Sequence, residues 1–211
     1  MATPKLDMLC LDFIKRVPDR LRNEFNPGKG TLPDGNFIRA EVIIDYVNRG
    51  MMDLFNFYWN AVEGNSKKFI SIFPELVKVT GNVSLIQGNY IIDQPYKDFF
   101  KVIGAVTASG NKFIKVKDEH LYTIYLSGEY AEYTANTDNL VIIQVNKMLA
   151  VFPQNFTGQI KIHYIRSPLD PYTGGYLIQN GSEDSPFMEH WHKQIIDYAY
   201  FRYLQETYQT S

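Results

Sequence analysis

The histidine pair near the C-terminus is the first place where residue types suggest chemistry. His190 and His192 stand beside Glu189, and zinc takes His, Cys and carboxylate ligands. Residues two apart on a helix point about 200° apart, so these two histidines are not expected to share a metal. No CxxC pair stands anywhere in the chain. We therefore expect one packed histidine, one solvated histidine and no metal site.

Three further patterns could support catalysis or phosphate binding, and each lacks a required partner. Cys10 lies in an apolar helical pattern, far in sequence from every histidine that could activate it. Glu129 and Glu132 fall between expected strands, where a solvated loop is expected. Gly28-Lys29-Gly30 lacks the glycine spacing and the following helix start of a phosphate-binding loop. We expect no catalytic residue and no cofactor, and hence a protein that is not an enzyme.

The composition is that of an ordinary globular chain without the charge of a general nucleic-acid binder. The 211 residues are 45% hydrophobic and 21% charged, with a formal net charge of −2. Binding nucleic acid through overall charge needs clustered Lys and Arg to displace counterions. The single cysteine excludes an intramolecular disulfide, and no stretch approaches about 18 uninterrupted apolar residues. The first residues lack a secretory signal pattern. We expect a protein made in a reducing cytoplasm, with no membrane span.

Aromatic residues are the one unusual feature of the composition. They make up 15% of the chain, as 15 Tyr, 14 Phe and 2 Trp. Tyrosine is favoured where a ring is half covered and its hydroxyl still needs a partner, which describes interfaces as well as cores.

The N-terminal part of the chain has helical periodicity. Apolar residues at helical spacing run over 6–25, where Pro18 is expected to break or kink the helix, and over 37–62. Gly50 stands on the apolar stripe of the second helix. Glycine in a helix interior costs roughly 1 kcal/mol against alanine, so Gly50 indicates a close contact with another helix. Further apolar residues lie off this stripe, namely Ile44, Met52, Phe57 and Trp59. A neighbouring subunit is expected to cover part of them.

The period changes to two between residues 76 and 167. Strands are expected over 76–79, 83–86, 100–106, 112–116, 121–126, 140–145, 148–152 and 159–165. Turns that contain Gly, Asn or Pro separate them. Seven or eight short strands at this spacing are typical of an antiparallel sandwich or a small barrel.

An irregular arm and a final helix complete the chain. The arm, residues 168–185, is rich in Gly and Asn, and helical period returns over 186–209. Ser185 is placed to cap this helix, and Pro186 suits a first turn.

The order of elements predicts an α+β fold in a single domain over residues 1–211. Its expected parts are a helical layer over 1–64, a central antiparallel β-sandwich or barrel module over 76–167, the arm over 168–185 and the C-terminal helix over 186–209.

Several short motifs support a family resemblance. The second helix contains Tyr46-Val47-Asn48-Arg49-Gly50, and the β module closes with Phe152-Pro153 and then Ile162-His163-Tyr164 ahead of Pro168. In these motifs and in its order of elements the chain resembles the head–tail connector (neck adaptor or ring) proteins of tailed bacteriophages. It is most similar to the ring proteins of crAss-like short-tailed phages that infect gut Bacteroides. The resemblance covers nearly the whole chain, and its motifs are packing and turn signals.

The resemblance implies a structural subunit of the virion neck. Copies of such a protein form a ring, a dodecamer, that joins the portal protein to further neck and tail proteins and extends the DNA channel. DNA passes through the lumen without specific binding. The arm and the C-terminal helix are then expected to contact the portal, with aromatic side chains as anchors, and deletion of residues 186–211 is expected to leave a folded protein that no longer binds it. The anchors expected from this reading are Trp59, Phe187, Trp191, Tyr200, Tyr203 and Tyr208.

A ligand-binding β-sandwich is the alternative, for example a carbohydrate-binding module of a phage or bacterial protein with exposed aromatic platforms. The aromatic content and the β core suit it. The long helices at both ends do not, and both Trp59 and Trp191 fall in helices. A glycan array distinguishes the two readings.

Overall fold

The computed structural model describes two compact units. It covers residues 5–17, 40–85, 89–91, 97–110, 112–128, 139–146, 148–170, 174–177 and 184–209. The helical unit comprises Met1–Leu76 with Ser167–Ser211, and the β unit comprises Val77–Arg166. The fold is α+β, as expected, and the β unit ends within one residue of the predicted β module. Where one domain was expected, the chain divides in two, and the C-terminal helix joins the N-terminal helices in one unit.

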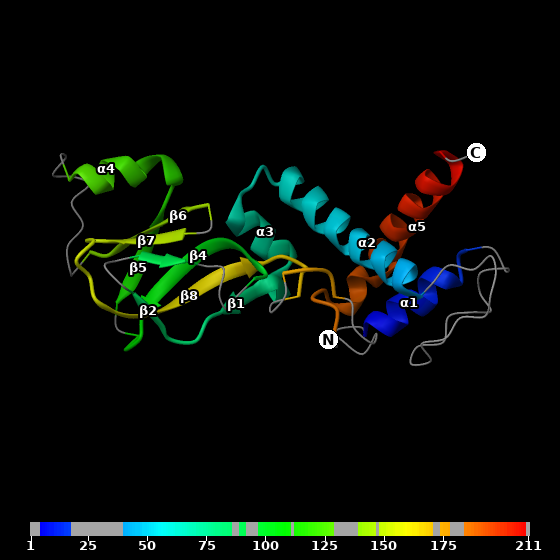
Figure 1. Ribbon diagram of the computed structural model, residues 1–211, viewed down its shortest axis with the longest axis horizontal. Helices are drawn as coiled ribbons and strands as arrows, with labels where there is room; N and C mark the ends of the chain where they lie inside the picture. Colours follow the sequence, from blue (N-terminus) through cyan, green and yellow to red (C-terminus); the bar gives the residue numbers. More distant parts are fainter. Residues whose placement is uncertain are drawn as a thin grey trace. The chain divides into compact units, whose positions relative to one another are not determined.

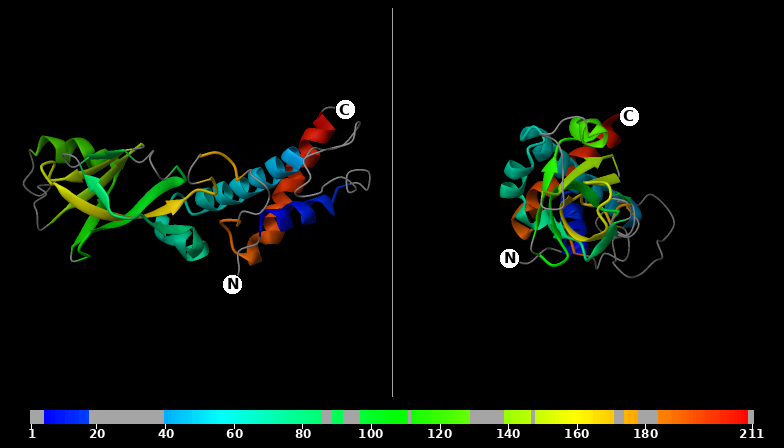
Figure 2. Two further views of the ribbon diagram at one scale, coloured as in Figure 1. Left: turned by 60° about the horizontal axis from the view of Figure 1, so that its bottom comes forward. Right: turned by 90° about the vertical axis from the view of Figure 1, so that its left-hand side faces the viewer.

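Three helices form the centre of the helical unit (Figure 1). They are α1 (Leu6–Ile14), α2 (Ala40–Ala61) and α5 (His192–Gln209). Both α1 and α5 pack against α2, and α1 also packs against α5, so the three helices lie together in each view (Figures 1 and 2). The part of the first predicted helix beyond residue 17 lies outside the described residues.

Gly50 lies at the closest approach of α2 and α5. A Cβ on Gly50 would stand 2.5 Å from the carbonyl oxygen of Ile195 and 2.9 Å from the backbone nitrogen of Ala199. The close helix contact predicted from this glycine is confirmed.

A short helix that periodicity did not predict follows α2. Helix α3 (Ser66–Ile72) begins at Asn65, whose Oδ1 accepts a hydrogen bond from the Lys68 N–H at 3.1 Å. The 3-10 turn η2 (Pro74–Leu76) comes next. Phe69, Phe73 and Leu76 are all buried, so this segment is part of the hydrophobic core and not a linker.

The C-terminal helix begins later than predicted. A 3-10 turn, η5 (Glu189–Trp191), precedes α5, which starts at His192. Ser185 does not cap α5. Its Oγ accepts a hydrogen bond from the Phe187 N–H at 3.1 Å and closes a local turn, which directs the Phe187 ring into the core.

The β unit is a curled mixed sheet that forms a half-barrel. Its described strands are β1 (Val77–Val79), β2 (Val83–Leu85), β3 (Asn89–Ile91), β4 (Phe99–Thr107), β5 (Phe113–Lys117), β6 (Val141–Val145), β7 (Met148–Phe152) and β8 (Gly158–Arg166). The order is β1-β8-β4-β5-β6-β7-β3, and β2 also pairs with β8. Every described pairing is antiparallel except β5 with β6, which is parallel, so the all-antiparallel expectation fails there.

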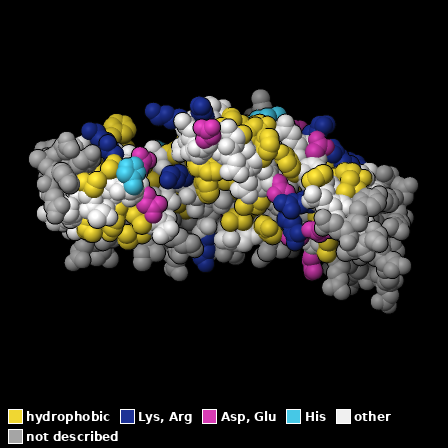
Figure 3. All heavy atoms as spheres, turned by 90° about the horizontal axis from the view of Figure 1, so that it is seen from above, with side chains coloured by type: hydrophobic (Ala, Val, Ile, Leu, Met, Phe, Trp, Pro, Cys, Tyr) yellow, Lys and Arg dark blue, Asp and Glu magenta, His cyan; other side chains and the backbone are white. Residues whose placement is uncertain are grey.

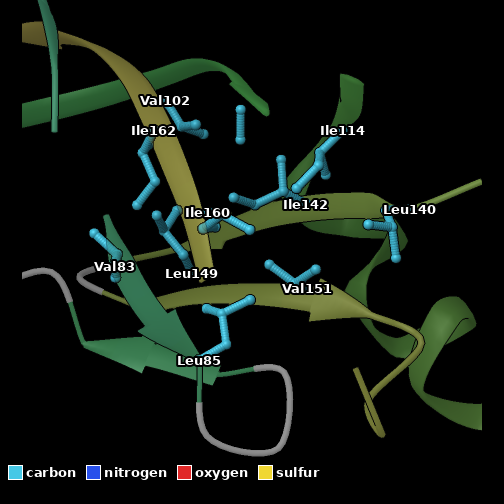
Figure 4. Packing of buried hydrophobic residues seen from close by; sticks show 11 residues of the cluster. Val83, Leu85, Val102, Ile114, Leu140, Ile142, Leu149, Val151, Ile160 and Ile162 are labelled. Atoms are coloured by element: carbon cyan, nitrogen blue, oxygen red, sulfur yellow. The ribbon is translucent and has the colours of Figure 1, made fainter. Parts of the chain in front are cut away.

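The concave side of the sheet encloses an aliphatic core (Figure 4). Six strands, β2 and β4 to β8, contribute side chains to it, and in β2, β7 and β8 these are alternate residues, as the period of two predicts. The labelled members are Val83, Leu85, Val102, Ile114, Leu140, Ile142, Leu149, Val151, Ile160 and Ile162.

The predicted strand over 121–126 is wrong, because this segment is helical. The 3-10 turn η3 (Glu119–Leu121) leads into helix α4 (Tyr122–Ser127), which ends at Gly128 with a positive φ of 64°. Tyr122 and Tyr125 pack against Phe152 of β7, with ring centroids 6.0 and 5.6 Å apart. Residues three apart lie on one side of a helix but on opposite faces of a strand, so the packing of both rings on Phe152 requires the helix. The alternation of Tyr122, Ile124 and Leu126 also suits a strand, so tertiary packing decides.

No helix in the described part of the chain combines the length and the apolar character that a membrane crossing requires.

Candidate interaction surface

Three of the six predicted anchors lie in the interior of the helical unit. Phe187 is fully buried, Trp191 is 9% exposed and Tyr203 is 7% exposed. Helix α5 packs against α1 and α2, and Phe73 packs against Phe187 and Trp191, so one chain shields these three rings by itself. These three residues are therefore core residues, and the prediction that they form an exposed docking face is corrected.

The buried rings form one aromatic cluster. Phe73 is at its centre, with ring centroids 4.5 Å from Trp191, 5.5 Å from Phe187 and 5.1 Å from Phe69. Most of these contacts are tilted or edge-on, the arrangements that the ring quadrupole favours. The cluster shows that some of the aromatic residues serve the core of one chain.

The other predicted anchors are partly covered or undescribed. Trp59 is half-buried, with its ring edge-on to Phe69 at 5.2 Å. Tyr200 is half-buried and stacks on Tyr203 at 6.1 Å. The side chain of Tyr208 lies outside the described residues.

A different set of rings is exposed on α2 and α5. Phe57 is 54% exposed and Phe201 is 58% exposed. Tyr198 is half-buried, and its ring centroid lies 6.1 Å from that of Phe57. We call Phe57, Tyr198 and Phe201 the aromatic face. The side of the molecule drawn in Figure 3 shows exposed hydrophobic side chains in groups, with charged side chains between them.

An ion pair borders the aromatic face. Arg202 donates from Nε and Nη2 to the two carboxylate oxygens of Asp53, at 2.7 and 2.8 Å. Together with Tyr198, Phe201 and Gln205 this pair lines a shallow depression of about 310 Å³. Burial raises the pKa of the Tyr198 phenol, and the nearby Tyr58 and Asp53 raise that pKa further, so the ring is neutral at physiological pH.

Part of this surface was visible in the sequence. Phe57 stands off the apolar stripe of α2, and cover by another subunit was expected for it. Phe201 was missed. It follows Tyr198 by three residues, and this spacing places both on one side of a helix.

Asn48 fixes part of the arm to the helical unit. Its amide is fully buried; Nδ2 donates to the Leu177 carbonyl at 2.7 Å, and Oδ1 accepts from the Leu177 N–H at 2.9 Å. Leu177 is itself only 5% exposed. At the other end of the arm, Lys5 and Asp184 form a β-bridge and an ion pair of 2.6 Å. The described parts of the arm are thus attached to their own unit.

The histidines show one packed and one solvated side chain, as predicted. His192 has 16% of its side chain exposed and lies 2.9 Å from the Asp12 carboxylate, while His190 is exposed. Within the described residues, no three His, Cys, Asp or Glu side chains come together as metal ligands would. Glu129, Glu132 and the glycines at 28 and 30 lie outside the described residues.

A buried carboxylate is the most unusual titratable group of the β unit. Asp98 is 2% exposed, accepts a hydrogen bond from the Tyr164 hydroxyl at 3.3 Å, and lies 3.0 Å from Arg166 Nε. Burial raises the pKa of Asp98, and Arg166 and Tyr164 oppose that rise. Because Asp98 directly precedes β4 and its carboxylate contacts Tyr164 and Arg166 of β8, we interpret this cluster as a structural tie between the start of β4 and β8.

Comparison with known proteins assigns no family to the chain: no protein-family model matches it, and a search of curated proteins returns no significant match.

Proposed function

We propose that this chain is a non-catalytic structural subunit of a tailed-bacteriophage neck, where copies of it form a ring that joins the portal to the tail and extends the DNA channel. The observation that carries the proposal is the aromatic face. Phe57 and Phe201 expose more than half of their surface beside Tyr198, with an Arg–carboxylate pair at the border. Aromatic side chains and arginine are enriched at the cores of protein interfaces, and tyrosine and arginine are among the residues that most often carry binding energy there.

The family resemblance supports the kind of assembly. Two positions of its motif have defined structural roles in this chain: Asn48 holds the arm, and Gly50 allows α2 and α5 into close contact. These roles concern the shape of the helical unit and not chemistry, which suits a structural protein.

Reconstitution with the cognate portal protein tests the proposal. Purified chain mixed with portal is expected to form rings coaxial with the portal, seen by electron microscopy and by native mass measurement. Connector subunits of this kind are often monomeric until they meet the portal. The test of the proposal is therefore the behaviour of the mixture, and a monomeric isolated chain does not contradict it. A chain that neither binds the portal nor forms rings in the mixture overturns the proposal.

Point substitutions are the appropriate variants, because deletion of residues 186–211 would remove Phe187, Ile195 and Ala199 from the core of the helical unit. Phe57→Ser combined with Phe201→Ser is expected to reduce ring formation at least tenfold, about 1.4 kcal/mol in assembly free energy. Phe113→Ser is the matched control, since Phe113 is 84% exposed but belongs to the β unit.

The carbohydrate-binding alternative gains no support from the described residues, because both tryptophans belong to the helical unit and Trp191 is buried. Specific, saturable binding on a glycan array would favour it.

A further inference from the structure

A second exposed surface of the helical unit is a hollow between α1 and the start of α5. Its volume is about 510 Å³. Its lining includes Met8 and Asp12 of α1 and Lys15 directly after it, together with His190, His192 and Lys193. We call it the basic hollow, because Lys15, Arg16 and Lys193 outnumber the acidic lining residues Asp12 and Glu189.

The basic hollow and the aromatic face lie on opposite sides of α5. The hollow is lined by α5 residues 192, 193 and 196, and the depression beside the aromatic face is lined by α5 residues 198, 201, 202 and 205. Successive residues of a helix are turned by about 100°, so the mean directions of these two sets are roughly 180° apart. One neighbouring copy therefore cannot cover both surfaces of the same subunit.

The two surfaces are chemically complementary. The side chains of Lys15 and Lys193 are 72% and 80% exposed, and ammonium groups are attracted to the faces of aromatic rings. Met8 is 51% exposed, and a thioether packs favourably against an aromatic ring. The ion pairs of Lys15 with Asp12 and of Lys193 with Asp197 are at the surface, where such pairs contribute about 0–1 kcal/mol, so they do not prevent a ring from docking.

We propose that the aromatic face of one copy docks in the basic hollow of the next copy. The choice of a second copy of the chain as the docking partner rests on the proposed function. Because the paired surfaces differ and lie on opposite sides of α5, the contact is head-to-tail. Contacts of this type close into rings when the rotation between neighbours allows it, and otherwise give open filaments.

Cysteine cross-linking tests the contact without removing the side chains that make it. Gln205→Cys places a thiol beside the aromatic face, and Glu189→Cys places one in the basic hollow; both native residues are exposed. The two positions are roughly 24 Å apart along one chain, too far for a short bismaleimide to join them. The native Cys10 is fully buried with its pKa raised to about 12, mainly by burial, so it does not react.

The double variant is expected to give a ladder of dimers, trimers and higher oligomers, with at least tenfold more cross-linked product than either single variant. The reaction is run on the chain alone and with cognate portal. Adding Phe57→Ser and Phe201→Ser is expected to abolish the ladder, whereas adding Phe113→Ser leaves it unchanged. Dimers from Gln205→Cys alone would indicate a symmetric contact and overturn the inference, as would the lack of a ladder both with and without portal.

The outcome separates the inference from the proposed function. A ladder from a chain that never binds the portal would support the head-to-tail contact and overturn the neck assignment. Portal-bound rings whose double variant gives no ladder would support the neck assignment and overturn this contact.

Discussion

Two side-chain amides act as substitutes for backbone, one in each unit. Asn48 donates to and accepts from Leu177, as a neighbouring strand would. Gln144 of β6 does the same for β4: its Oε1 accepts from the Val102 N–H at 2.8 Å, and its Nε2 donates to the Phe100 carbonyl at 3.1 Å. An amide offers both a donor and an acceptor, which a carboxylate of the same shape does not.

Asn48→Asp tests this role at its most buried position. The carboxylate would face the Leu177 and Ile44 carbonyls, both of which accept hydrogen bonds from Nδ2 in the native chain. We expect the free energy of unfolding to fall by about 3 kcal/mol, measured by urea unfolding at pH 7. Gln144→Glu is the comparison variant; its side chain is only partly buried, so a smaller loss is expected. A loss below about 1 kcal/mol for Asn48→Asp would contradict the structural role of the amide.

At the scale of elements, the stability of the helical unit depends on how closely α2 and α5 approach. A methyl group at position 50 would meet backbone atoms of Ile195 and Ala199, which cannot rotate away as a side chain could. The gain in helix propensity from glycine to alanine is about 1 kcal/mol. Separation of two packed helices costs more than that, so the packing term is expected to prevail.

Gly50→Ala is therefore expected to lower the free energy of unfolding by about 2 kcal/mol, measured by urea unfolding. Gly104→Ala serves as the control. A Cβ there meets only the Cβ of His163 at 3.9 Å, an ordinary contact, so a change within about 0.5 kcal/mol is expected. Stabilisation by Gly50→Ala would show that propensity outweighs the contact.

The attachment of α1 to α5 is expected to depend on pH. Asp197 of α5 pairs with Arg16 beyond the end of α1 and with Lys193 at 3.0 Å. Burial raises the pKa of Asp197, but the hydrogen bonds from Arg16 and Lys193 outweigh it, and the pKa lies below its ordinary value. A lowered carboxyl pKa contributes stability above the unfolded-state pKa, and that contribution is lost as pH falls through the folded-state pKa.

Asp197→Asn is expected to cost about 0.5–1 kcal/mol at pH 7, because the pair is partly solvated. The difference from the native chain should begin to shrink near the ordinary carboxyl pKa of 3.8 and should vanish once the pH lies below the lowered folded-state pKa. Urea unfolding of both proteins at pH 7, 5 and 3 measures this. A difference that stays constant across that range would assign the effect to something other than the charge.

At the scale of the whole molecule, the chain has two cores of different composition. The described core of the helical unit combines aromatic rings with Leu, Ile and Val, whereas that of the β unit consists mainly of Val, Ile and Leu. The β unit is continuous in sequence, whereas the helical unit joins the two ends of the chain.

Residues 77–166 expressed alone are expected to fold, because this segment contains its own aliphatic core and the tie between Asp98 and Arg166. The expected result is cooperative urea unfolding by circular dichroism. Both tryptophans lie in the helical unit, so tryptophan fluorescence in the full chain reports that unit alone. A fragment that unfolds without cooperativity and binds a hydrophobic dye would show that the β unit depends on the rest of the chain.

The sequence by itself determined the features that follow from local periodicity and from single special residues. These are the helices at both ends, the limits of the β module, and the close contact at Gly50. Each of these features depends on residues close together in the sequence or on a glycine that lacks a side chain. Each can therefore be predicted without knowledge of the tertiary structure.

Only the tertiary structure decided which apolar side chains are core and which are surface. Phe187, Trp191 and Tyr203 are buried, whereas Phe201, on the same helix as Tyr203, is exposed. The same aromatic residue type suits either place, and the outcome depends on which flank of α5 meets α1 and α2. The helical conformation of 121–126 was decided in the same way, because its apolar spacing fits a strand or a helix until β7 provides the surface against which it packs.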